Sequence, residues 1–207
     1  MSNLLLSALA TSDLVGLSSS VFASLATSQI TTLTTSQIIC LTSKQLKPLS
    51  ANQLAALTTA QVEALRTSQI AALNASSIGG LGTAQITSLR TDQLAAFTTL
   101  EIKSLNSNQL GSLKTSQLAA LTTTQLNTLG YEAVQGITTS QFAAFSSATF
   151  NALSTNQLSG LKSAQIAAFD TGQLNFLTTA QVAALNPNAI PGPVSYTHLT
   201  LPTNREV

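Results

Sequence analysis

Residues 1–192 divide into twenty-four consecutive octapeptides without a single insertion or deletion. The repeat reads LTTxQIxx, as in LTTSQIIC over 33–40 and LTTAQVAA over 177–184. Its first residue is Leu, Phe, Ile or Met in every copy, and its sixth is Ile, Leu, Val or Phe. So strict a period is typical of an elongated array in which each unit packs only on its neighbours. The sequence therefore predicts one repeat domain over 1–192.

The local pattern within an octad favours a short helix. In Thr34-Thr35-Ser36-Gln37 a hydroxyl stands three residues before a Gln, which is the signature of a capping box at a helix N-terminus. Sixteen of the 24 octads carry that Gln. The two apolar positions lie alternately three and five residues apart, whereas a strand needs apolar residues two apart. We predict an all-α solenoid with one capped helix per octad, and the abundant Thr keeps a β-solenoid as the alternative.

One continuous helix does not fit this period. Eight residues advance an α-helix by about 80° beyond two full turns, so the apolar pair would spiral around the helix axis. The chain must therefore bend at every octad. Isolated helices shorter than about 12–15 residues are marginal in water, so stacking must stabilise these short ones. We expect the apolar positions, Leu118 among them, to lie inside, and Lys114 to lie outside.

The sequence also has a second, longer period of three octads, or 24 residues. Residues at the variable octad positions recur with it, which predicts three short helices per superhelical turn, with two octads per turn as the alternative. Small residues on one line fit a close approach of backbones, and Phe residues on another fit a thicker part of the core. The recurring sets are the basic line Arg66, Arg90, Lys114 and Lys162, the aromatic line Phe97, Phe145 and Phe169, and the glycine line Gly16, Gly136 and Gly160.

Composition excludes several classes of function. Charged residues make up 7% of the chain and the formal net charge is +1, so no general attraction to nucleic acid or anionic membrane is expected. No apolar run reaches the length of about 18 residues that a membrane span needs. The start of the chain lacks the basic segment of a signal peptide. No His lies within the repeats and the acidic residues are scattered, so we expect no enzyme, no metal site and no cofactor.

Three features could bind a partner: the low-charge polar surface of the rod, which we favour, the Thr and Ser ladders as a flat hydroxyl array, and the basic line Arg66, Arg90, Lys114 and Lys162. With three octads per turn the charges of the basic line would stand one coil apart and match an anionic polymer. Four charges without interleaved aromatic residues also fit a solvated face. The Thr and Ser ladders are explained by helix capping.

The closing segment departs from the repeat. Residues 194–207, VSYTHLTLPTNREV, contain the only His of the chain and share none of the octad pattern. Their first ten residues resemble the in-frame translation of a transposase adapter used to prepare sequencing libraries. This resemblance implies that 193–207 form a non-native, disordered tail. It also implies that the natural gene continues past Gly192, so that the chain is a fragment.

The octads themselves resemble the Thr- and Gln-rich repeats, written LTTxQ(I/L)xxL, of large bacterial proteins described as surface, adhesin-like or RTX-type. The Gly- and Asp-rich nonapeptides that bind calcium in RTX modules are absent from this sequence. The resemblance implies a structural or interaction array within a larger bacterial surface or secreted protein. Its partner would be a protein or a polysaccharide surface. The alternative is an intracellular scaffold that binds a protein or polyanionic partner through the basic line.

Overall fold

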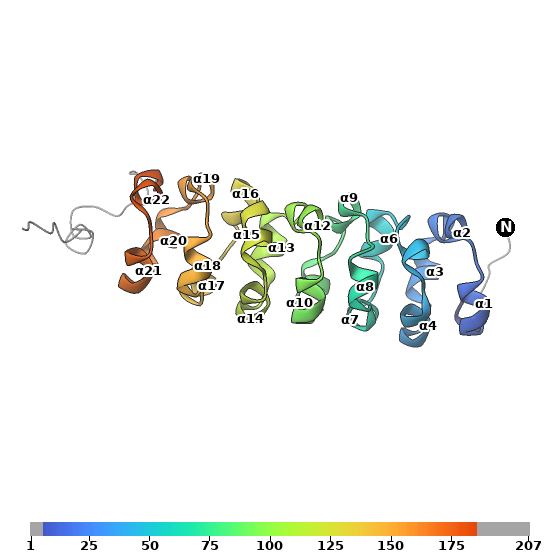
Figure 1. Ribbon diagram of the computed structural model, residues 1–207. Coiled ribbons are helices and arrows are strands. Elements are labelled where there is room, and N and C mark those ends of the chain that lie inside the picture. The colour runs from blue at the N-terminus through green and yellow to red at the C-terminus, as the bar shows by residue number, and fades with distance from the viewer. Residues whose placement is uncertain (1–5, 186–207) are drawn as a thin grey trace, which may run out of the picture.

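The computed structural model describes residues 6–185, and over this range the protein is a rod of short helices without a strand (Figure 1). The predicted all-α fold is confirmed, and the β-solenoid alternative is wrong. After a 3-10 turn at Leu6–Ala8, the helices are α1 (Thr11–Val15), α2 (Ser19–Ser24), α3 (Thr27–Thr31), α4 (Thr35–Cys40), α5 (Ser43–Leu46), α6 (Ala51–Ala55), α7 (Thr59–Ala64), α8 (Thr67–Ile70), α9 (Ala75–Ile78), α10 (Thr83–Ser88), α11 (Thr91–Ala95), α12 (Thr99–Lys103), α13 (Ser107–Ser112), α14 (Thr115–Ala119), α15 (Thr123–Thr128), α16 (Tyr131–Val134), α17 (Thr139–Ala143), α18 (Ser147–Asn151), α19 (Thr155–Ser159), α20 (Ser163–Ala167), α21 (Thr171–Asn175) and α22 (Thr179–Ala184).

Each helix begins at the third residue of an octad, directly after its cap. At α4 the N-cap Thr34 is extended, with φ −73° and ψ 158°, and its hydroxyl accepts a hydrogen bond from the backbone N–H of Gln37. After the helix, Leu41 is again extended, with φ −61° and ψ 140°. At this octad boundary two consecutive extended residues, Leu41 and Thr42, therefore interrupt the helical path. This produces the bend that the eight-residue period demands.

The helices stack in three columns that run the length of the rod. Each helix packs against the helix three places before it and three places after it in the chain, as α4 does with α1 and α7. Three octads therefore complete one coil, as the second period predicts, and the alternative of two octads per turn is wrong. The columns are α1-α4-α7-α10-α13-α16-α19-α22, α2-α5-α8-α11-α14-α17-α20 and α3-α6-α9-α12-α15-α18-α21.

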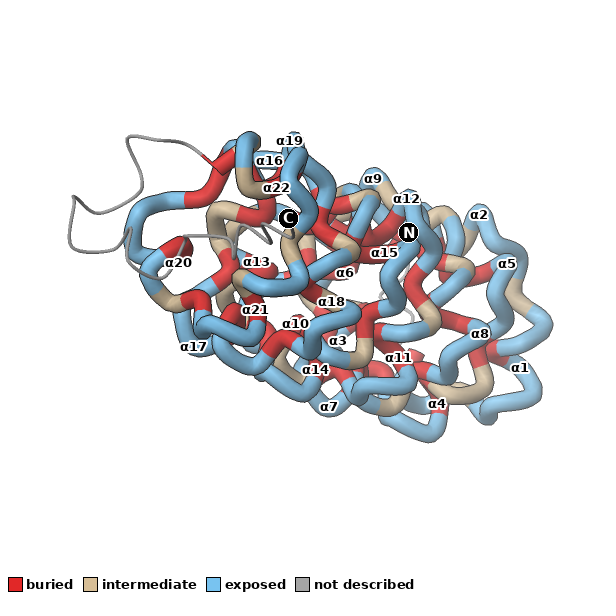
Figure 2. Tube along the Cα trace, turned by 60° about the vertical axis from the view of Figure 1, so that its left-hand side comes forward, coloured by how far each residue is buried: buried red, intermediate tan, exposed pale blue. Residues whose placement is uncertain are grey.

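The core is built from the two apolar octad positions. Ile38 at the sixth position is fully buried and Leu41 at the first position of the next octad is 4% exposed. The buried positions follow the interior of the coil along the whole rod (Figure 2). As predicted, Leu118 is buried and Lys114 is exposed.

Toward the C-terminal end, phenylalanines replace the aliphatic core residues. The Phe169 ring packs edge-on against Phe150 and Phe142, with ring centroids 4.5 and 5.6 Å away, and Phe142 also contacts Phe145. Phe97, the third member of the aromatic line, is buried as well. The aromatic line is thus part of the core, as predicted.

Of the three glycines of the glycine line, Gly136 makes the predicted close backbone contact with another coil, whereas Gly160 lies against the Tyr131 side chain and Gly16 is near only its own helix. A Cβ atom added to Gly136 would lie 2.0 Å from the carbonyl oxygen of Ser107 in the coil before it. Gly80, outside this line, meets the backbone of Ala51 in the same way, with a distance of 2.2 Å. None of these glycines has a positive φ, so the requirement is for space and not for a special backbone conformation.

Two predictions fall outside the described residues. These are the tail 193–207 with its adapter-like sequence, and the two ends of the 1–192 array, residues 1–5 and 186–192. Within residues 6–185, no helix is long and apolar enough to cross a bilayer.

Candidate functional site

The most frequent polar side chain of the interior, the Gln at the fifth octad position, connects successive coils. Gln93 shows the arrangement and is completely buried. Its Oε1 accepts a hydrogen bond from the backbone N–H of Arg90 at 2.8 Å, which completes the cap of α11. Its Nε2 donates to the carbonyl oxygens of Val62 and Leu65, at 2.9 and 2.6 Å. In the coil before, Val62 lies in the last turn of α7 and Leu65 in the bend between α7 and α8.

This arrangement satisfies two kinds of backbone group with one side chain. Helix N-termini leave N–H groups without intrahelical partners, and helix C-termini leave carbonyl groups. In Gln93 the amide oxygen accepts from such an N–H group, and the amide nitrogen donates to the carbonyl oxygens of Leu65 and Val62. The Val62 oxygen also accepts from the backbone N–H of Leu65. Glutamines that donate to a carbonyl 28 residues earlier are Gln37, Gln45, Gln53, Gln61, Gln69, Gln85, Gln93, Gln109, Gln117, Gln125, Gln141, Gln157, Gln165, Gln173 and Gln181.

Sequence reasoning predicts only the capping half of this arrangement. The link between coils was missed because its partners lie 28 and 31 residues back and no local motif points to them. One signal for it exists in the sequence. A capping box accepts either Glu or Gln, yet sixteen octads have Gln at this position and only one has Glu, which indicates that a donor is needed there.

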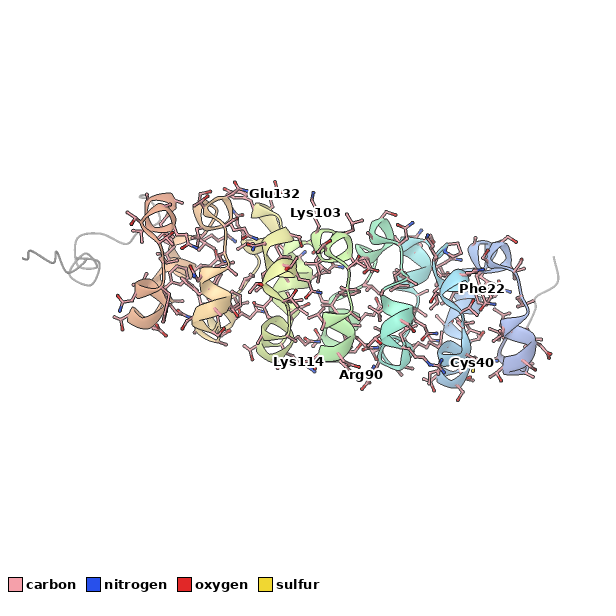
Figure 3. The ribbon with its side chains drawn as sticks, in the orientation of Figure 1. Phe22, Cys40, Arg90, Lys103, Lys114 and Glu132 are labelled. Carbon is pink, nitrogen blue, oxygen red and sulfur yellow. The ribbon has the colours of Figure 1, made fainter. Side chains whose placement is uncertain are left out.

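The basic line is a geometric line in the structure. Arg66, Arg90, Lys114 and Lys162 are the N-cap residues of α8, α11, α14 and α20, which belong to one column of helices. All four are exposed. Arg90 and Lys114 lie along the same edge of the rod (Figure 3). Thr138, the N-cap of α17, interrupts the line between Lys114 and Lys162.

One member of this line is already engaged by a carboxylate. Arg90 donates from Nε and Nη2 to the two carboxylate oxygens of Asp92, at 3.0 and 3.2 Å, and from Nη1 to the backbone oxygen of Glu63. The hydrogen bond from Arg90 lowers the pKa of Asp92, and the charge of Arg90 adds to that effect. This is the single ion pair among residues 6–185. It weakens the positive field of the line at its second position.

A shallow hollow lies on the first column of helices. It has a volume of about 930 Å³ and spans parts of α10, α13 and α16. Its lining is polar, and one of its residues, Lys162, also belongs to the basic line. The lining residues are Thr83, Ser107, Asn108, Gly111, Ser112, Tyr131, Glu132, Gln135, Gly136 and Lys162.

Tyr131 gives this hollow an aromatic wall. Its side chain is 39% exposed, and Phe176 is the other aromatic residue of the described chain that is similarly open to solvent. The ring lies directly against Gly160 of the next coil, where a Cβ atom would be only 2.4 Å from it. Because Gly160 has no side chain, it leaves the space that the Tyr131 ring occupies. Glu132, beside it, projects from the edge of the rod opposite Arg90 and Lys114 (Figure 3).

The hollow arises in an octad that departs from the repeat. Octad 129–136 reads LGYEAVQG and has Ala133 where the Gln stands elsewhere. The sequence shows this departure, and Tyr131 is the only Tyr within the repeats, so these two features are the sequence signal for the hollow. The hollow offers a ring face, amides, hydroxyls, one carboxylate and one ammonium group, which suit a polar ligand held by stacking and hydrogen bonds. The described residues hold no cluster of three or more His, Cys, Asp or Glu side chains.

The chain matches a known repeat family. The ALTTAQ repeat matches residues 41–75, 67–99, 134–171 and 150–187, which together are more than half of the chain. Its six letters occur unchanged at residues 56–61, from Ala56 to Gln61. A comparison with curated proteins gave no match.

Proposed function

Because the chain belongs to the ALTTAQ repeat family, we propose that it is a non-enzymatic interaction array within a larger bacterial surface or secreted adhesin-like protein. The array serves as a rigid spacer that presents a polar binding surface. Its ligand is a polysaccharide, bound in the hollow around Tyr131. The observation that carries the proposal is the exposed Tyr131 ring among Asn108, Glu132 and Gln135.

The distribution of polar groups supports an array without a reaction centre. The buried glutamines use both ends of their amides on backbone groups, as Gln93 does. They are therefore structural, and no amide of this set is left to act on a ligand. The remaining polar side chains are mostly Thr and Ser of the helix caps.

The chemistry of the hollow favours a sugar over a nucleic acid. A sugar ring stacks its C–H face on an aromatic ring and hydrogen-bonds at its edge to amides and carboxylates. Tyr131 supplies the ring, and Asn108, Gln135 and Glu132 supply the edge groups. The Glu132 carboxylate would repel a phosphate backbone, whereas Lys162 alone would attract one.

Binding to an array of neutral and anionic oligosaccharides tests this proposal. We expect the 207-residue chain to bind a neutral oligosaccharide, and Tyr131→Ala to weaken that binding at least about tenfold, which corresponds to 1.4 kcal/mol. Tyr131→Phe keeps the ring and should retain most of the affinity. Phe176→Ala removes another exposed ring elsewhere on the rod and is the matched control. Equal losses for Tyr131→Ala and Phe176→Ala would contradict a specific site.

Salt dependence separates this proposal from the scaffold alternative, which rests on the alignment of four basic N-cap residues in one column. Binding through the basic line should weaken steeply as salt is added, and it should be lost when Arg66, Arg90, Lys114 and Lys162 are all changed to Ser. Sugar binding in the hollow should barely respond to salt.

Sequencing the complete gene on an independent template tests the surface location, because a secretion signal or anchor is expected in it.

A further inference from the structure

Glu101 stands where the repeat has Gln, and it forms half of the usual bonds. It occupies the fifth position of octad 97–104, in α12. Its Oε2 accepts from the backbone N–H of Thr98 at 2.6 Å, and its own N–H donates to the Thr98 hydroxyl at 3.3 Å. The cap of α12 is therefore complete. Glu101 differs from the glutamines of the other octads in the bonding of its second carboxyl oxygen.

That second oxygen, Oε1, is buried and has no hydrogen-bond partner. The residue as a whole is 1% exposed. Since Oε2 takes the place of the Gln amide oxygen, Oε1 takes the place of the amide nitrogen. The register of the solenoid, 31 and 28 residues back, points Oε1 at the carbonyl oxygens of Ile70 and Leu73. A deprotonated carboxylate would set acceptor against acceptors there, which is costly in a buried site.

Among residues 6–185, no charged group compensates for this arrangement. α12 packs against α9 and α15, and neither helix contains a titratable side chain. Lys103, on α12 itself, projects from the rod into solvent (Figure 3). Lys44 and Lys47 share a surface hollow with Ala71, Ala72 and Leu73. Burial raises the pKa of Glu101, and only hydrogen bonds from Thr98 oppose the rise, so neither lysine acts on the carboxyl.

We propose that Glu101 is a proton-operated joint between two coils: its carboxyl group is neutral in the closed solenoid and donates a hydrogen bond from Oε1 to the carbonyl oxygen of Ile70 or Leu73. The proton replaces the amide hydrogens of the missing Gln. Loss of that proton leaves a buried anion facing carbonyl groups. The contact between α12 and α9 then loosens, while the links on either side keep their glutamines.

The direction of the pH effect follows from the proton balance. The folded chain holds the proton more tightly than the unfolded chain, whose Glu pKa is near the ordinary value of 4.5. The contribution of Glu101 to stability is therefore fully present below about pH 4.5 and is lost as the pH rises through the raised pKa. A Gln at this position would have no such dependence.

Thermal unfolding and local hydrogen exchange of wild type and Glu101→Gln test the joint from about pH 4 to about pH 8. We expect equal melting temperatures at the acid end. Toward the alkaline end Glu101→Gln should exceed wild type by about 2 °C or more. In wild type alone, amide exchange should become faster than the intrinsic pH trend around α9 and α12. Glu63→Gln, at an exposed glutamate, is the matched control and should follow wild type.

The opposite substitution, Gln to Glu in a regular octad, should create the same pH dependence at another position. Gln93→Glu should acquire the same loss of stability with rising pH, now at the contact of α11 with α8. Isotope-edited infrared spectroscopy of the Glu101 carboxyl gives a direct readout, and a protonated carboxylic acid band should persist above pH 4.5. A parallel pH response of wild type and Glu101→Gln would overturn the proposal. So would stability at neutral pH that depends on added Na⁺, K⁺ or Ca²⁺, because a metal cation would then be the missing partner.

Discussion

Octads 89–96 and 129–136 hold their coils together in different ways. In the first, Gln93 is fully buried and bonds to the last turn of α7 and to the bend between α7 and α8. In the second, Ala133 offers no amide, and Gly136 instead brings its backbone directly against Ser107. The second octad also contributes Tyr131 to the hollow. The comparison indicates that the regular octads provide rigidity, whereas a departure from the repeat provides the surface feature.

A second pair of coils repeats this contrast. Octad 73–80 has Ser77 at the Gln position and ends in Gly80, which lies against the backbone of Ala51. Both octads therefore combine the loss of the Gln with a glycine at the closest backbone approach. Two packing modes coexist in one array without a change of register.

The largest expected effect comes from breaking the core that both modes share. Leu118→Asp puts a carboxylate at a fully buried position, and we expect a loss of more than about 4 kcal/mol of unfolding free energy, with the array opening around α14. Urea unfolding with hydrogen exchange measures this. Lys114→Ser, in the same octad but exposed, should change stability by less than about 0.5 kcal/mol. The reverse order would show that inside and outside are wrongly assigned.

Removing one link between coils should have the next largest effect. Gln93→Leu keeps the volume but leaves the N–H of Arg90 and the carbonyl of Leu65 without a partner, and the Val62 carbonyl keeps only its backbone bond from Leu65. We expect this to cost about 2–4 kcal/mol. Exchange protection should fall at α8 and α11. Gln135→Leu is the control, because this half-buried Gln stands at the seventh octad position, and it should be nearly neutral. Equal effects of the two changes would show that the coil-to-coil bonds contribute nothing.

Substitution at the close backbone contact of Gly80 should have the smallest effect on stability, and the neighbouring Gly79 provides a closely matched control. Gly80→Ala would place a methyl group 2.2 Å from the carbonyl oxygen of Ala51, so we expect a loss of about 1–3 kcal/mol. Gly79, its neighbour, has nothing within 4 Å of an added Cβ atom. Gly79→Ala should be neutral or slightly stabilising, by up to about 1 kcal/mol. Melting temperatures of both variants decide the matter, and a stable Gly80→Ala protein would mean that the backbones can separate there.

Much of this fold follows from the octad alone. The capping signature at Thr34 to Gln37, the buried pair at positions six and one, and the period of three octads each predict what the structure shows. They do so because each is a local pattern or a simple repeat of one. The family match confirms the repeat, and the bacterial surface role remains a proposal.

The parts that could not be predicted depend on contacts between coils. Gln93 reaches carbonyls in the coil before, and which backbone groups meet there depends on how closely the coils stack. The same holds for Glu101: the sequence shows it at the Gln position, but that its Oε1 is buried without a partner depends on the packing of the coils. The hollow at Tyr131 depends on Gly160 and Lys162 from a later coil, so the composition of its own octad could not define it.

The register of the coil-to-coil links restricts how such an array can lengthen by duplication. Adding a single octad keeps every Gln opposite a bend, but it moves all later side chains to the next of the three columns. A surface row such as Arg66 and Lys114 would then be split across two faces. Adding three octads preserves both the links and the faces. Lengthening by whole coils is therefore the route by which a gene of this kind can extend its product while keeping a binding face aligned.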